Sequence, residues 1–263
     1  MQTFNFHTHT TRCRHAEGED REYVENAIKG GLKTLGFSDH SPYVFKDGYY
    51  SGFRMMPEEL DGYVKSVLDL KKEYEKDIDI FVGLEAEYYP EFFVDFLSLI
   101  RPYPIDYMIL GQHFLGNEID GQRGAARRGQ NENSLMEYAN QVLEAMKTGV
   151  FTYLAHPDMI RYRENEEIEN QAWKMICEGA KKYNVPLEIN LLGIRDHRHY
   201  PYAGFWKVAG EIQPPVTIGS DAHSPDVAAD NASFEQAMLI IKKYNLNYIG
   251  MPRLINPFGR KDK

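Results

Sequence analysis

Histidine and acidic side chains follow one strand-like apolar run after another along this chain. Six such runs end in side chains that commonly bind metal, and these are His7 and His9, Asp39 and His40, Glu85, His113, His156, and Asp221 and His223. In barrels of alternating strands and helices, active-site residues lie at the carboxyl ends of the strands. These residues should therefore converge on one rim and form a multinuclear metal site.

Helical patterns occupy the intervals between the apolar runs. Apolar spacing predicts helices near residues 20–30, 57–70, 91–100, 132–148, 165–183 and 232–243. Strands are predicted at 3–6, 34–38, 78–84, 107–112, 151–155, 186–190 and 216–220, with a weak eighth at 247–250. This alternation predicts an α/β fold with parallel strands, and no change of composition divides residues 1–263 into more than one domain. Three long loops, 41–56, 114–131 and 191–203, should overhang the same rim.

The composition favours a protein of a reducing compartment such as the cytoplasm. The chain has only two cysteines, no basic and apolar leader, and no run of about 18 apolar residues, so we expect neither disulfides nor a membrane span. A formal net charge of −9 disfavours bulk electrostatic binding to nucleic acid. An anionic substrate remains compatible with that charge, because a metal cluster dominates its local field. The oligomeric state is left open.

The spacing of the metal-type residues favours two or three divalent ions. His7 and His9 are two positions apart, so both imidazoles face the same side of an extended strand. Asp221 and His223 repeat this spacing, and Glu85 adds a carboxylate able to bridge two ions. Imidazole with carboxylate suits Zn, Mn or Fe. Two ions about 3.5–4 Å apart can clamp an in-line displacement, which fits the hydrolysis of a phosphate ester.

The motifs of the chain resemble those of the polymerase and histidinol phosphatase (PHP) superfamily. The matching segments are His7-Thr-His9, His15, Ser38-Asp-His40, Gly83-Leu-Glu85, Gly111-Gln-His113, Ala155-His156-Pro157 and Gly219-Ser-Asp221-Ala-His223. The resemblance implies a distorted (β/α)7 barrel. It also implies three ion sites: one on His7, His9, Glu85 and Asp221, a second on Glu85, His113 and His156, and a third on His15, His40 and His223.

Within the superfamily, the length and the long loop after His40 look most like the monofunctional histidinol-phosphate phosphatases. This resemblance implies hydrolysis of L-histidinol phosphate to L-histidinol and phosphate in histidine biosynthesis, with Glu85, Asp221 and His223 in catalysis. One alternative is a PHP phosphoesterase that acts on nucleotide phosphates or nucleic-acid ends. Another is an amidohydrolase-type barrel that cleaves C–N bonds, although no lysine ends a strand here. A barrel that only binds metal is a third.

Three residues near the predicted ligands have alternative interpretations. Glu87 would face the same side as Glu85 and could be the ligand instead, although the family pattern favours Glu85. Asp39 either orients a ligating imidazole or caps a turn or helix. Cys13 is close to His15 in the sequence, and we expect it to be a small packed residue because the third site already has three histidines.

Arginines in the long loops are candidates for binding phosphate, because a guanidinium matches phosphate bidentately. Arg161 and Arg195 follow the strands that end at His156 and Asn190, and we expect them, with His197, to contact the substrate. His197 and His199 are more plausible as exposed or substrate-facing residues than as ligands. The aromatic residues of loop 41–56 could form an apolar wall over the site, and Arg123, Arg127 and Arg128 are expected to be surface charge.

Overall fold

The computed structural model describes residues 1–119 and 123–259, and its strands all run parallel in a curled wall. One sheet has the order β1-β2-β3-β4 and the other the order β5-β6-β7. The strands are β1 (Phe4–Asn5), β2 (Thr34–Phe37), β3 (Asp79–Ala86), β4 (Tyr107–Leu110), β5 (Leu187–Asn190), β6 (Pro215–Gly219) and β7 (Asn247–Tyr248). The weak eighth strand of the sequence is therefore present as β7, which pairs with the start of β6.

Single bridges join the two sheets into a distorted barrel. Thr8 bridges Ala222, so the segment after β1 meets the segment after β6. The predicted strand 151–155 lies between β4 and β5, but only Leu154 forms bridges, to Leu110 and Leu187. The prediction of a regular strand there was wrong in extent. The segment donates to β4 at Met108 O and Leu110 O, and Leu154 bonds across to the β5 side through Pro186 O.

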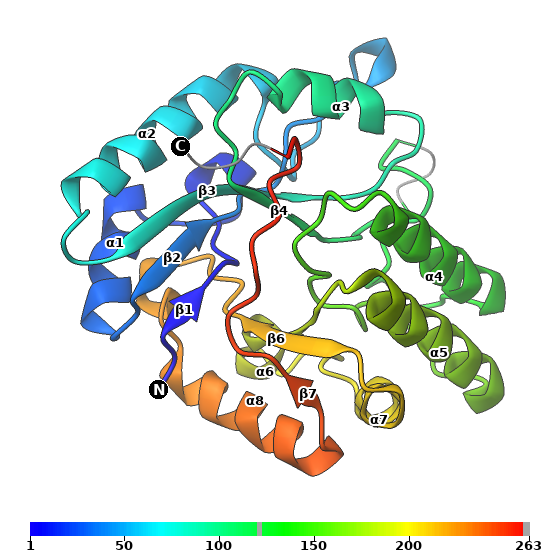
Figure 1. Cartoon of the computed structure of the whole chain (residues 1–263). Coiled ribbons are helices and arrows are strands. Elements are labelled where there is room, and N and C mark those ends of the chain that lie inside the picture. The colour runs from blue at the N-terminus through cyan, green and yellow to red at the C-terminus, as the bar shows by residue number, and fades with distance from the viewer. Residues whose placement is uncertain (120–122, 260–263) are drawn as a thin grey trace.

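Helices surround this wall, as Figure 1 shows. Six predicted helices are present: α1 (Asp20–Lys29), α2 (Leu60–Glu73), α3 (Phe93–Ile100), α4 (Glu132–Lys147), α5 (Glu166–Tyr183) and α8 (Asn231–Tyr244). Two further helices, α6 (Leu191–Arg195) and α7 (Ala203–Ile212), were not predicted. Short 3-10 turns cover Thr11–Cys13, Lys46–Gly48, Pro57–Glu59 and Pro225–Val227.

Side-chain caps fix several of these helix boundaries. Asn131 and Asn165 accept backbone N–H groups at the starts of α4 and α5, and Asp230 does the same for α8. These caps satisfy N–H groups that have no partner inside the helix. Asn190 likewise accepts from Gly193 N, and so turns the chain from β5 directly into α6 at the rim.

The two ends of the barrel differ in how they are closed. The interior holds a buried aromatic cluster in which the Tyr107 hydroxyl donates to Phe6 O and Phe37 O. At the amino ends of the strands the C-terminal segment crosses the barrel, where Ile255 N bonds Thr152 Oγ1 and Thr217 Oγ1 bonds Gly250 O (Figure 1). The carboxyl ends carry the three long loops.

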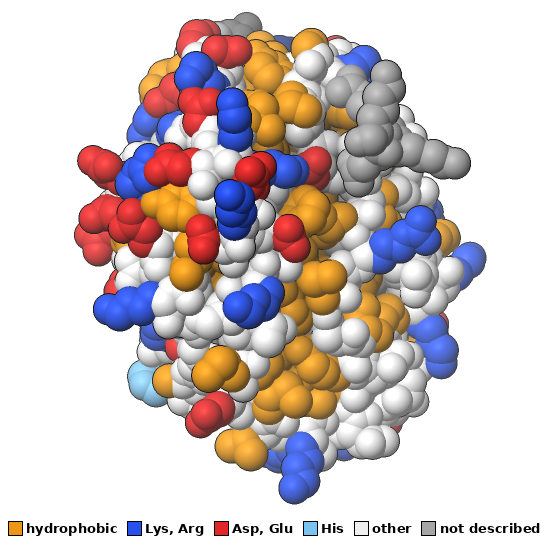
Figure 2. Space-filling view, turned by 60° about the vertical axis from the view of Figure 1, so that its left-hand side comes forward, with side chains coloured by type: hydrophobic (Ala, Val, Ile, Leu, Met, Phe, Trp, Pro, Cys, Tyr) orange, Lys and Arg blue, Asp and Glu red, His pale blue; other side chains and the backbone are white. Residues whose placement is uncertain are grey.

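Acidic and basic side chains are intermingled on the outer helices. Arg21 of α1 pairs with Glu73 of α2, and Lys65 pairs with Asp69 one turn along α2. Figure 2 shows this mixture of signs at one side of the face that it presents, next to a band of hydrophobic side chains. In the described part of the chain, no helix is both long and apolar enough to cross a membrane.

Candidate metal centre

Glu85 lies at the centre of five imidazoles at the carboxyl end of the barrel. Its Oε1 is 3.0 Å from His156 Nε2, 3.5 Å from His7 Nε2 and 3.6 Å from His113 Nε2. Its Oε2 is 3.0 Å from His40 Nδ1 and 3.5 Å from His9 Nε2. One buried carboxylate therefore faces ring nitrogens contributed by four separate segments of the barrel wall and rim.

Asp221 forms a second focus beside Glu85. Its Oδ1 lies 3.6 Å from His7 Nε2, 3.3 Å from His9 Nε2 and 3.3 Å from His223 Nδ1. The structure thus brings together all nine residues named from the sequence. Three-residue groups with ligand atoms within 4.8 Å of one another include His7–His9–Glu85, His7–His156–Asp221 and His15–His40–His223.

Glycines leave the space that two buried carboxylates occupy. A Cβ atom on Gly111 would lie 1.9 Å from Glu85 Oε1, and one on Gly219 would lie 1.8 Å from Glu188 Oε1. Both distances are far below van der Waals contact, so any side chain at either position would displace the carboxylate. The glycines of the Gly111-Gln-His113 and Gly219-Ser-Asp221 motifs are therefore required by the centre itself.

Two of the candidate ligands have a left-handed backbone. His156 has φ of 31° and Asp221 has φ of 49°. Residues other than glycine rarely adopt this conformation, and those that do are concentrated at functional sites, where the surrounding fold maintains the strain. Here the turns aim both side chains back over the barrel toward Glu85 and His7.

Carboxylates behind the imidazoles hold their remaining ring nitrogens. His7 Nδ1 lies 2.8 Å from Glu188 Oε1, and His113 Nδ1 lies 3.0 Å from Glu87 Oε1. Asp39 Oδ1 lies 3.5 Å from His9 Nδ1, while its Oδ2 accepts from the Thr10 hydroxyl. Asp39 Oδ1 also accepts from His40 N at 2.8 Å, so the contacts of Asp39 fit both of its interpretations, and its role stays a prediction. Glu87 faces the outer nitrogen of His113, and Glu85 faces the inner one.

Glu188 was missed by the reasoning from sequence. It is fully buried in β5, and its Oε2 accepts from His156 N and Asn190 Nδ2. A charged residue between Leu187 and Ile189 in a strand buried on both faces is a usable signal, because burying a carboxylate is costly unless it is paired.

Burial and mutual charge set the protonation of the centre. Burial alone would raise the pKa of Glu85 and Asp221, but the neighbouring histidines hold the pKa of both well below the usual range. Burial opposes a charged His9, yet the nearby carboxylates of Asp221, Asp39 and Glu85 raise its pKa to about 9. Burial and the charges of His223 and His9 lower the pKa of His15 to about 4.

Many buried polar atoms of the centre have no hydrogen-bond partner in the described structure. They are His7 Nε2, both nitrogens of His9, His40 Nδ1, Glu85 Oε2, His156 Nδ1 and His223 Nε2. Buried polar groups are normally satisfied, so such a concentration at one point requires an explanation. A set of imidazole nitrogens and carboxylate oxygens fits divalent ions such as Zn, Mn or Fe.

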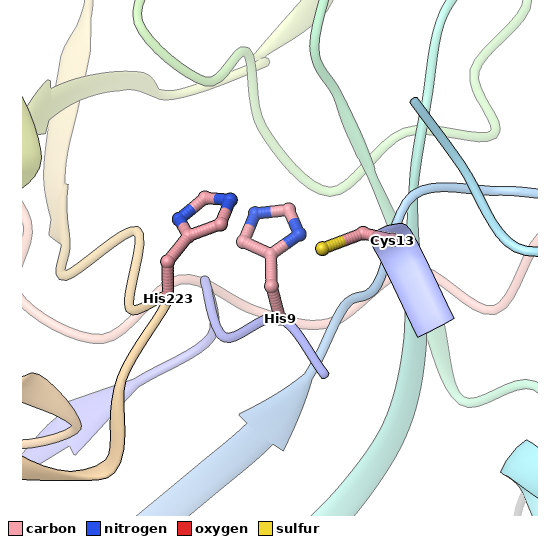
Figure 3. Close-up of side chains that lie close together, drawn as sticks. All are labelled: His9, Cys13 and His223. Carbon is pink, nitrogen blue, oxygen red and sulfur yellow. The ribbon is translucent and has the colours of Figure 1, made fainter. Parts of the chain in front are cut away.

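Cys13 lies beside this centre. Figure 3 shows the His9 ring between His223 and the sulfur of Cys13, and the potential ligand atoms of the three lie within 4.8 Å of one another. Cys13 is buried, and burial and the charge of Asp39 raise the pKa of its thiol. A neutral thiol beside the rings agrees with the expectation that Cys13 is a small packed residue. That Cys13 is not a ligand stays a prediction.

The predicted substrate residues are in different positions. Arg195 lines a pocket of about 470 Å³ with His15 and His223, while its Nη1 lies 2.7 Å from Asp230 Oδ2. Arg161 is half-buried outside this pocket. Burial and the charges of Arg161 and two other arginines lower the pKa of His199, so cationic groups gather on that side of the rim. His197 is exposed and does not line the pocket.

A curled parallel wall with a histidine and carboxylate cluster at the carboxyl ends of its strands defines a class of metal-site barrels. The family model of the PHP domain matches residues 5–191. This match spans more than half of the chain, and the chain belongs to the PHP domain family.

Known proteins similar to this chain include several histidinol-phosphatases. The histidinol-phosphatase of Bacillus subtilis is 35% identical over 259 residues, covering 85% of this chain and 94% of that protein. A probable histidinol-phosphatase of Deinococcus radiodurans is 28% identical, covering 83% and 85%. The structure of histidinol phosphate phosphatase from Lactococcus lactis, complexed with zinc, L-histidinol and phosphate, matches with a TM-score of 0.74 at 20% identity, covering 99% of both chains. That likeness confirms the predicted fold.

Proposed function

We propose that this chain is a single-domain, metal-dependent phosphomonoesterase that hydrolyses L-histidinol phosphate to L-histidinol and phosphate. The observation that carries the proposal is the convergence of unpartnered histidine nitrogens on Glu85 and Asp221 beside a pocket that contains Arg195. The names of similar proteins support the same activity, and one of them binds zinc, L-histidinol and phosphate together. Histidine biosynthesis in the cytoplasm is the setting that this activity implies.

The nine clustered residues would hold two or three ions. We assign His7, His9, Glu85 and Asp221 to the first ion, and Glu85, His113 and His156 to the second. His15, His40 and His223 are assigned to the third. When bound, such ions supply positive charge that stabilises phosphoryl transfer and activate water as a nucleophile. Glu188 and Glu87 hold the outer nitrogens of His7 and His113, so with ions bound the inner nitrogens of these two imidazoles would face the centre unprotonated.

The chain's own residues complete the chemistry at phosphorus. Arg195 lines the pocket next to His15 and His223, so its guanidinium binds a phosphate oxygen in this scheme. Arg161 adds positive charge from the loop after His156. Asp221 Oδ1 lies 3.3 Å from His223 Nδ1, and both residues would serve the reaction through the ions that they hold.

The pocket also suits the alcohol part of the substrate. Glu17 and Asp196 are exposed acidic residues on its walls. The backbone of Glu17 is held in place, because its N–H donates to His223 O at 2.9 Å and its carbonyl accepts from the Tyr23 hydroxyl at 2.7 Å. L-histidinol phosphate carries an ammonium group, and a carboxylate a short distance from the phosphate site would attract it.

The two other enzyme classes lack comparable support. A C–N hydrolase would leave the His15, His40 and His223 group without a purpose, and no lysine ends a strand of the wall. For a phosphoesterase of nucleic-acid ends, the formal net charge of −9 opposes bulk attraction of a polyanion. The substrate panel described next separates these activities.

The test is turnover by zinc-, manganese- and iron-loaded protein on a panel of phosphate esters. L-histidinol phosphate should have the highest kcat/KM, and nucleoside monophosphates and sugar phosphates should be much poorer. Equal turnover of nucleotides would favour the second phosphoesterase class. If no phosphate ester reacts and an amide is cleaved, the proposal is wrong.

A further inference from the structure

Arg54 is a buried arginine that joins three separate loops above the barrel. Only 1% of its surface is exposed, although it is in the long loop 41–56. Its Nη1 and Nη2 lie 2.9 Å and 3.0 Å from the two carboxylate oxygens of Glu87, which follows β3. Its Nε and Nη2 lie 2.9 Å and 2.6 Å from Glu118 Oε2, in the loop after β4. Nη1 also donates to Ser41 O at 3.0 Å.

Burying these three charged groups costs free energy of folding, which suggests a functional role. A buried ion pair seldom adds stability over a well-packed apolar group, because both partners lose their hydration. Here one cation lies between two buried carboxylates, so the group carries an excess negative charge before any other partner is counted. The positive charge that would balance this excess is nearest at the metal centre, because Glu87 also contacts His113.

Glu87 transmits the position of Arg54 to His113. Both Glu87 oxygens are held by the guanidinium, and Oε1 also lies 3.0 Å from His113 Nδ1. A carboxylate fixed in this way places the proton of His113 on Nδ1 and leaves Nε2 free, 3.6 Å from Glu85 Oε1. Arg54 contacts both oxygens of Glu87, and this favours Glu85 over Glu87 as the ligand.

The residue before Arg54 lies directly against the centre. The Phe53 ring is centred 4.3 Å from that of His40, 5.0 Å from that of His113 and 5.4 Å from that of His15. Anchoring Arg54 therefore also fixes an aromatic side chain over three candidate ligands. The buried guanidinium of Arg54 thus orients His113 through Glu87. It also fixes the adjacent Phe53, whose apolar ring lies over the centre.

We infer that Arg54 is a positioning residue of the metal centre, which acts on His113 through Glu87. This inference rests on the proposed metal centre and goes beyond it by assigning a role to a residue that touches neither ion nor substrate. The consequence is a specific coupling. At His113, Arg54 and Glu87 act on metal affinity as one unit, because both reach this imidazole through the same ring nitrogen.

The experiment measures zinc affinity by competition with a chelator for wild type, Arg54→Met, Glu87→Gln and the double variant. Each single variant should hold its weakest zinc ion about 10- to 100-fold less tightly, the usual effect of removing a partner behind a ligating histidine. The double variant should bind zinc no more weakly than whichever single variant binds it more weakly. A long-range proton–nitrogen spectrum of the zinc-free single variants, recorded at a pH where the ring is neutral, should show that His113 loses the single Nδ1–H tautomer that Glu87 selects in wild type. Arg21→Met, which breaks the exposed pair with Glu73, is the matched control and should change neither quantity.

Two results overturn the inference. One is unchanged zinc affinity in folded Arg54→Met, and the other is a double variant in which the two losses add. If Arg54→Met does not fold, Arg54→Lys decides the same question, because it keeps the buried charge but cannot hold both Glu87 oxygens. If Arg54→Lys also fails to fold, unchanged zinc affinity in Glu87→Gln overturns the inference, because the coupling passes through Glu87. Wild type that binds no zinc would instead contradict the proposed metal centre.

Discussion

His7 Nδ1 lies 2.8 Å from Glu188 Oε1, and neither side chain is exposed. Glu188 is held in turn by His156 N at 3.1 Å and Asn190 Nδ2 at 3.0 Å. The carboxylate thus fixes one candidate ligand through its ring and touches the backbone of a second. Strand β5 contributes no ligand of its own, yet it orients ligands from two other segments of the barrel.

Glu188→Gln should therefore weaken metal binding while leaving every ligand in place. An amide cannot offer the negative charge that favours His7 with its proton on Nδ1. We expect zinc affinity to fall about 10- to 100-fold, measured by chelator competition. Glu178→Gln, on the exposed face of α5, is the control. Unaltered zinc binding by folded Glu188→Gln would show that the contact is only structural.

Glu85→Gln should abolish most of the phosphatase activity. Its carboxylate faces five imidazoles, and the variant keeps its size while removing the charge. We expect kcat to fall on the order of 10²-fold or more, because metal charge supplies much of the stabilisation of the transition state. Steady-state kinetics with measured metal content tests this. Wild-type turnover at unchanged metal content would rule out a bridging role.

Arg161→Ala and Arg195→Ala should each impair the use of substrate without loss of metal. A charge-assisted contact to phosphate contributes roughly 1.5–3 kcal/mol, which corresponds to a loss in kcat/KM of about 10- to 150-fold. Arg128→Ala, on an exposed part of the loop after β4, should change little. A strong effect at Arg128 with none at Arg161 and Arg195 would move the phosphate site to that loop.

Glu17→Gln should alter the choice of substrate rather than the chemistry. We expect kcat/KM for L-histidinol phosphate to fall about 5-fold, since an ammonium–carboxylate pair near the surface contributes on the order of 1 kcal/mol. The analogue that lacks only the amino group should be hydrolysed equally well by variant and wild type. Asp61→Asn on exposed α2 controls for a change in overall charge. Equal losses on both substrates would contradict recognition of the amine.

Asp158→Asn should stabilise the protein, and more so as the pH rises. Burial raises the pKa of Asp158 to about 6, although its Oδ2 accepts from Tyr202 N and Trp206 Nε1. Its protonated form therefore favours folding below about pH 4, and this contribution is lost as the pH rises through about 6. An asparagine oxygen can accept both hydrogen bonds without charge. We expect a gain in unfolding free energy of up to about 3 kcal/mol at pH 7.5 and little change at pH 4. Urea unfolding at both pH values measures it, and a pH-independent difference would contradict this origin.

The sequence was sufficient to predict which histidine and acidic side chains gather at one rim, because each follows an apolar run; their role as ligands stays a prediction. His7, His113 and Asp221 each follow an apolar run, and the ends of parallel strands meet at one rim. Helices such as α5 begin at capping residues that are visible in the sequence, here Asn165. The apolar run at 151–155 also predicts a strand. Its pairing depends on segments far away in the chain, however, and only Leu154 forms bridges.

Contacts between distant segments were the part that could not be predicted. Glu188 and Arg54 resemble ordinary polar residues of a strand and a loop, and their role appears only when the carboxylates and imidazoles around them are in position. Helix α7 was missed because Gly204 and Gly210 weaken the helical pattern, whereas Phe205, Trp206 and Val208 pack it against the core. Tertiary packing here outweighs local propensity.

The bridge between Thr8 and Ala222 has a consequence for the order of assembly during synthesis. His9 N donates to Ala222 O, and Ala222 N donates to His7 O, so the first pair of candidate ligands is aligned by a segment more than two hundred positions later. In a nascent chain, His7 and His9 emerge from the ribosome well before the segment around Ala222. Until that segment emerges, its hydrogen bonds cannot align the two histidines. Tight metal capture should thus come after closure of the barrel, and an early amino-terminal fragment should compete poorly for cellular zinc.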